Sequence, residues 1–152
     1  MIGARHLARD ERGTAVIEFG LLLPVIFGTF LGVLQIGISM FAYNSLRNVT
    51  AEASRYALVE YQNNRQMADW SVLENRIVAI APGSGLSPQR LTVDVEKAAI
   101  QRVSGAIELK ISVTYRVQSV LPFLGIDEIA TNYTRPVFLI DEALATGIPG
   151  SI

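Results

Sequence analysis

The sequence contains no cysteine and a single histidine, His6, and both shortages limit the chemistry that the chain can perform. Without cysteine there is no disulfide framework, no thiolate metal site and no cysteine nucleophile. One imidazole leaves little scope for base catalysis or a histidine-bound metal. The acidic residues are scattered rather than clustered, and no glycine-rich phosphate loop is present. We therefore expect no catalytic site, no metal and no cofactor.

An excess of charge of one sign is also missing. The chain has 13 basic and 14 acidic residues, a formal net charge of −1, so no basic field attracts nucleic acid. Its 152 residues suffice for one small domain plus a membrane span. Hydrophobic residues make up 50% of the chain, and a large share of them lies between residues 15 and 46.

Residues 19–46 form a run without a charged residue. This run is longer than the roughly 20 apolar residues that a membrane-spanning helix needs. A cleaved secretory signal has an apolar core of only about 7–15 residues, although residues 37–39 form a small-x-small triplet. A buried helix of a soluble domain would be shorter, and an interfacial helix would carry a charged face. We predict a transmembrane helix over residues 14–43.

Orientation follows from the flanking arginines. Arg5, Arg9 and Arg12 precede the apolar run, and such a bias holds a short flank in the cytoplasm. Arg47 and Arg55 lie on the side of a long domain, which translocates largely regardless of its charge. We expect a cytoplasmic N-terminus and an extracytoplasmic domain over residues 44–140.

Small residues recur every four positions in the run, at Gly20, Pro24, Gly28 and Gly32. A stripe of this kind lets two helices approach closely in lipid, so we interpret it as a helix-packing surface, although glycine is common in membrane helices generally. Pro24 removes one backbone hydrogen bond and tends to kink or loosen the helix.

Glu18 lies at the head of the same helix. A carboxylate in a spanning helix costs roughly 2.5–3.5 kcal/mol at the bilayer centre and less near the ends. We therefore expect the Glu18 carboxylate to have a partner. The alternative is that its side chain extends to the cytoplasmic membrane interface.

The segment around Glu18 is similar to the processing site of type IV pilin-like proteins: a glycine, four residues, then Glu18-Phe19 at the start of a long apolar helix. Residues 12–57 resemble TadE-type pseudopilins of tight-adherence (Flp) pili. Those proteins have a proline a few residues after the Glu-Phe, here Pro24, and a helix that ends in Ala-x-Arg-Tyr-Ala, here Ala53-Ser54-Arg55-Tyr56-Ala57. The resemblance implies that a prepilin peptidase cuts between Gly13 and Thr14 and removes residues 1–13 as a leader.

The resemblance further implies a structural minor pilin or pseudopilin of the bacterial inner membrane. Its partners would be the prepilin peptidase, other pilin subunits met through the N-terminal helix, and the inner-membrane assembly platform. Cleavage would place the Thr14 ammonium four residues from Glu18, within the same subunit or facing a neighbouring one. Many mature pilins begin with Phe, and Thr14 departs from that pattern. The long outer domain disfavours a major pilin subunit. The alternative is a bitopic protein whose outer domain binds an extracytoplasmic ligand or partner.

The outer part reads as α+β and pilin-like. The first helix continues with Leu46, Val49, Ala53 and Tyr56 on one face, either for its own domain or for a partner. A break at residues 62–65 precedes a second helix over residues 70–81. We expect Ser71-x-x-Glu74 to be its capping box and Trp70, Leu73, Ile77 and Ile80 its apolar face.

The remaining segments alternate with period two and predict a small antiparallel sheet. Strands are expected over residues 91–96, 107–118 and 128–135, with a slip at Lys97-Ala98, a turn at Ser104-Gly105 and an apolar loop over residues 121–125. Pro136 suits a strand end or an edge position. Residues 82–89 form a loop, and residues 141–152 a tail.

Overall fold

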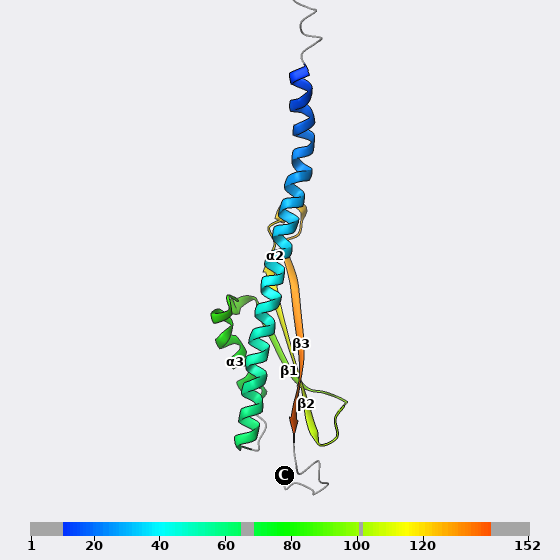
Figure 1. Ribbon diagram of the computed structural model, residues 1–152. Helices are drawn as coiled ribbons and strands as arrows, with labels where there is room; N and C mark the ends of the chain where they lie inside the picture. Colours follow the sequence, from blue (N-terminus) through cyan, green and yellow to red (C-terminus); the bar gives the residue numbers. More distant parts are fainter. Residues whose placement is uncertain (1–10, 65–68, 101, 141–152) are drawn as a thin grey trace, which may run out of the picture. The chain divides into compact units, whose positions relative to one another are not determined.

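The computed structural model describes residues 11–64, 69–100 and 102–140, and Figure 1 shows their arrangement. The helices are α2 (Glu11–Asn64) and α3 (Trp70–Ile80), and the strands are β1 (Leu91–Lys97), β2 (Ala106–Gln118) and β3 (Glu128–Ile140). Short 3-10 turns lie at Ala81–Ser84, Pro88–Arg90 and Pro122–Leu124. The predicted α+β class is confirmed. The tail and all but the last three residues of the predicted leader lie outside the described residues.

The chain divides into two compact units, residues 1–37 and 38–152. In the first unit α2 passes through Pro24 without a break in the helix. Its apolar side chains are largely exposed, with Phe19 at 59% and Phe30 at 64%. Residues 13–64 contain a stretch long and apolar enough to cross a membrane. The helix that we predicted from the uncharged run is therefore present and could span a bilayer.

In the second unit, the continuation of α2 supplies one side of the core. Leu46, Val49, Ala53 and Ala57 are buried at intervals of three and four residues, which brings them onto one helix face. The stripe predicted from Leu46 to Ala53 is confirmed, while Tyr56 is only partly buried. The helix contacts the sheet: Tyr43 of α2 meets Tyr133 of β3 edge to face, with ring centroids 5.6 Å apart.

Helix α3 begins two residues earlier than a capping box at Ser71 would require. Asp69 is the N-cap, and its side chain accepts a hydrogen bond from the Ser71 backbone N–H at 3.2 Å. Ser71 is therefore the second helical residue, and the prediction that it caps the helix was wrong. Both residue types cap well, but the chain direction before Trp70 presents the Asp69 carboxylate to the free N–H groups. Leu73 and Ile77 are buried as predicted.

The sheet is antiparallel with the order β1-β2-β3. Its central strand β2 alternates as predicted, since Leu109, Ile111, Val113 and Val117 are all buried. Strand β1 ends at Lys97, so the slip in the pattern marks a strand end. A turn at residues 104–105 follows, with Gly105 at φ 76°.

Strand β3 is longer than predicted. It continues to Ile140, so the expected end at residue 135 was wrong. Pro136 lies inside the strand, opposite Lys110 of β2. An edge strand can accept proline because one row of its N–H groups has no neighbouring strand to pair with.

Candidate functional site

The residues of the predicted processing motif lie in the first turns of α2. Gly13, Thr14, Glu18 and Phe19 are all helical and exposed. Thr14 and Glu18 are four residues apart, which puts them one turn apart on the same helix face, as predicted. Among the residues that the structure describes, none forms a hydrogen bond or ion pair with Glu18. The carboxylate is thus accessible to a group supplied from outside this part of the chain.

The small-residue stripe is open along its length. A Cβ atom added at Gly20, Gly28 or Gly32 would meet no atom within 4 Å, so nothing within the described chain requires glycine at these positions. Pro24 has no N–H to donate to the Gly20 carbonyl one turn earlier. One turn later the Thr29 hydroxyl donates to the Val25 carbonyl at 2.8 Å. The stripe therefore combines minimal side-chain volume with a locally weakened helix.

The second unit has a mostly apolar pocket of about 440 Å³. Its lining comes from the start of the unit in α2, the turn after α3 and the end of β2: Ile38, Phe41, Ala42, Gly85, Leu86, Arg90, Tyr115, Val117, Gln118, Ser119 and Val120. The lining includes one polar pair, in which an Arg90 Nη atom donates to Gln118 Oε1 at 3.2 Å. The lining has no nucleophile paired with a base, so the pocket is suited to apolar contact rather than to catalysis.

Gly85 shapes this pocket. Its φ of 76° is in the left-handed region, and a Cβ atom there would lie 3.1 Å from Phe41 Cζ. Glycine is needed at this position for its backbone conformation and for the space beside the Phe41 ring.

An ion pair between an exposed arginine and a buried glutamate is the feature that the sequence did not reveal: 59% of the Arg102 side chain and 5% of the Glu108 side chain are exposed. The period-two alternation of β2 groups Glu108 with the polar residues of the strand, yet only 4% of it is exposed. Arg102 Nε donates to both carboxylate oxygens, at 2.9 and 3.0 Å, and the guanidinium lies 5.6 Å from the centre of the Phe138 ring. These hydrogen bonds lower the pKa of Glu108 and raise the pKa of Arg102. The sequence did contain one indication of this pair, because Arg102 and Glu108 lie on either side of the turn predicted at Ser104-Gly105.

This pair connects the β1–β2 loop to the sheet. The Arg102 backbone N–H also donates to Glu108, at 3.4 Å. Because both charged groups are already engaged, the pair is suited to structure rather than to proton transfer. Within residues 11–64, 69–100 and 102–140, no three histidine or acidic side chains lie close enough to bind a metal ion.

The two units define a class of protein: one helix long and apolar enough to span a membrane, followed by a small α+β unit. Within this class, residues 13–55 match the family model of TadE-like proteins, which confirms the resemblance noted in the sequence. The match covers the apolar helix and its continuation, while α3 and the sheet lie beyond it. Neither a curated protein nor a solved structure matches the chain.

Proposed function

We propose that this chain is a minor pilin or pseudopilin that takes part in the assembly or initiation of a tight-adherence pilus. The observation that carries the proposal is the TadE-like match, because it begins at Gly13, the residue after which a prepilin peptidase would cut. Before assembly the protein is held in the bacterial inner membrane by the first part of α2. Its N-terminus is cytoplasmic and its second unit periplasmic.

Cleavage after Gly13 prepares the helix for assembly. It creates an α-ammonium group on Thr14, one turn from the exposed carboxylate of Glu18. A cation is thus formed where a carboxylate in a membrane helix needs one. In a filament the same carboxylate can pair with the Thr14 ammonium of a neighbouring subunit and set the register between subunits.

The open stripe supports helix–helix contact with other pilin subunits. In lipid, helices associate through close packing rather than through hydrophobicity, and small residues permit that packing. Gly20, Gly28 and Gly32 have free space around them, so a neighbouring helix can approach the α2 backbone there. The other partners are the prepilin peptidase and the inner-membrane assembly platform.

The N-terminal sequence of the membrane-extracted protein tests the processing step. We expect Thr14 as the first residue, and in Gly13→Ala we expect Met1 with the leader retained. The structure makes this variant informative, because an added Cβ at Gly13 meets nothing within 4 Å and the helix is undisturbed. Gly20→Ala is the matched control, equally open and helical, and should be processed normally. Normal processing of Gly13→Ala would refute the assigned cleavage site.

A Glu18→Val variant tests the assembly step. It should insert into the membrane normally, because an apolar side chain replaces a carboxylate, but the number of pili per cell should fall. Glu18→Asp keeps the charge and should retain more piliation than Glu18→Val. The comparison is made by counting pili in electron micrographs at equal levels of membrane-inserted protein. Unchanged piliation in Glu18→Val would show that the carboxylate has no part in assembly.

The apolar pocket favours a second candidate function, a bitopic protein whose outer unit binds an extracytoplasmic ligand. Its volume of about 440 Å³ is within the usual size range of small-molecule sites. A mature protein that begins at Met1 would support this candidate over the pilin.

A further inference from the structure

The loop that joins β2 to β3 is exposed and apolar. Phe123 is 67% exposed, Leu124 63% and Ile126 42%. No charged residue occurs between Arg116 and Asp127. Three large, exposed apolar side chains at the tip of one hairpin are unusual for a surface that faces water, so a partner of apolar character is indicated.

The loop is also well ordered by its own backbone. Its 3-10 turn, Pro122–Leu124, has hydrogen bonds from the Leu124 N–H to the Leu121 carbonyl and from the Gly125 N–H to the Pro122 carbonyl, both 3.0 Å. The hairpin is closed by the Ser119 N–H, which donates to the Asp127 carbonyl at 2.9 Å. Backbone groups that are already paired cost less to move into an apolar medium.

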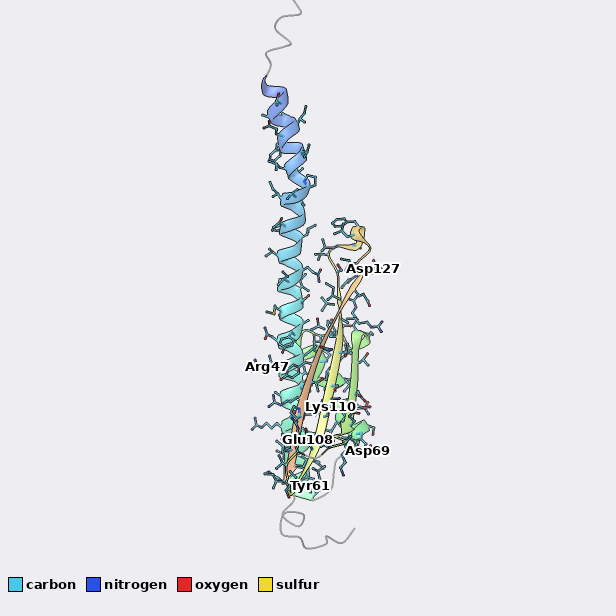
Figure 2. All side chains as sticks on the ribbon, turned by 90° about the vertical axis from the view of Figure 1, so that its right-hand side faces the viewer. Arg47, Tyr61, Asp69, Glu108, Lys110 and Asp127 are labelled. Carbon is cyan, nitrogen blue, oxygen red and sulfur yellow. The ribbon has the colours of Figure 1, made fainter. Side chains whose placement is uncertain are left out.

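The loop lies at the end of the second unit where α2 enters it. Val120, just before the loop, lines the same pocket as Ile38, the first residue of the unit. Figure 2 shows Asp127 at this end of the unit and Tyr61 and Asp69 at the opposite end. The exposed apolar side chains and the covalent junction with the apolar helix therefore share one end of the unit.

The length of the uncharged part of α2 indicates where along this helix the bilayer would end. Residues 19–38 of the uncharged run number about 20, which at about 1.5 Å per residue corresponds to the roughly 30 Å hydrocarbon thickness of a bilayer. A span that begins at Phe19 thus ends at Ile38, the level at which the second unit begins.

We propose that residues 121–126 insert into the surface of the bilayer that α2 spans, with Phe123, Leu124 and Ile126 in contact with lipid. Because the loop carries no charge, the contact is apolar and does not need anionic headgroups. The second unit is thereby held by two attachments, the helix and the loop. The proposal rests on the membrane span of the proposed function, but not on processing or on pilus assembly.

Site-directed spin labelling tests the proposal, because the chain has no cysteine and any introduced cysteine is unique. Phe123→Cys and Leu124→Cys each place a nitroxide at the tip of the β2–β3 loop. The Leu124→Cys variant keeps the Phe123 side chain. Ile100→Cys is the matched control: it is 79% exposed and lies in the β1–β2 connection, the hairpin end that Arg102 and Glu108 join. Phe27→Cys reports on the span itself. The full-length protein is reconstituted in phosphatidylcholine vesicles, and the accessibility of each label to oxygen and to an aqueous nickel chelate is measured.

We expect the labels at residues 123 and 124 to resemble that at residue 27, with high oxygen and low nickel accessibility, and the label at residue 100 to show the reverse. Tip labels as accessible to nickel as the label at residue 100 would overturn the proposal. Spin–spin broadening at the tip that grows with the protein-to-lipid ratio would also overturn it, because a second copy would then cover the loop. A nickel-accessible label at residue 27 would instead refute the membrane span and with it the proposed function.

Discussion

Replacement of Gly85 by alanine should destabilise the second unit in two separable ways. The φ of 76° at Gly85 is in the left-handed region, where a non-glycine residue costs about 1–2 kcal/mol. The new Cβ would also lie 3.1 and 3.2 Å from two atoms of the Phe41 ring, closer than an ordinary contact of 3.4–4 Å. Overpacking typically costs about 1–3 kcal/mol, and the low end applies because Phe41 is 59% exposed and can turn aside.

Gly125 provides a matched control. It has the same φ of 76°, but a Cβ atom added there meets nothing within 4 Å. Gly125→Ala should therefore lower the free energy of unfolding by about 1–2 kcal/mol, the cost of the backbone conformation alone. Gly85→Ala should lower it by about 2–3 kcal/mol, so that the difference of about 1 kcal/mol measures the contact with Phe41.

Urea unfolding of the full chain in detergent micelles, followed by the fluorescence of Trp70, measures these values. Trp70 is the only tryptophan and packs against the core, so its emission reports on the second unit. Adding Phe41→Ala to both glycine variants should remove the difference between them, because the ring is no longer present. Equal destabilisation by Gly85→Ala and Gly125→Ala in the presence of Phe41 would refute the steric argument.

Two further predictions concern the core and its ion pair. Arg102 lowers the pKa of Glu108 below its ordinary 4.5, so the pair should stabilise the protein above about pH 4.5 and lose that effect as the pH falls through the lowered pKa. The thermal midpoint of Glu108→Gln should thus lie below that of the wild type at pH 7, and a gap that does not narrow on acidification would contradict this. Ile77 is fully buried, and Ile77→Ala should cost about 2–5 kcal/mol of unfolding free energy. Ile100→Ala, at a site 79% exposed, should change it by less than about 0.5 kcal/mol; similar losses in both would contradict the assigned core.

Local patterns predicted most of the secondary structure. The alternation along β2 identified a strand with one buried face because the side-chain period of a strand is two. The spacing of Leu73 and Ile77 identified the buried face of α3 for the corresponding helical reason. These patterns depend on residues close together in the chain, and the sequence alone is sufficient to read them.

The two wrong predictions, the cap of α3 and the end of β3, have a different origin. Asp69 and Ser71 are both good capping residues, and the path of the chain into α3 decides between them. The extent of β3 beyond Pro136 depends on its pairing with β2 and on its edge position, which is a property of the sheet. Neither outcome can be read from a window of neighbouring residues.

The sequence by itself determined the apolar helix and the motif at its head. Gly13, Glu18 and the four-residue stripe lie on one continuous helix, where spacing along the chain is also spacing in space. Only the tertiary structure decided that Glu108 is buried against Arg102 and that the apolar hairpin tip shares one end of the second unit with Ile38. The ion pair depends on how the β1–β2 turn folds Arg102 back onto β2. The position of the hairpin tip depends on packing against α2, which brings together residues far apart in the chain.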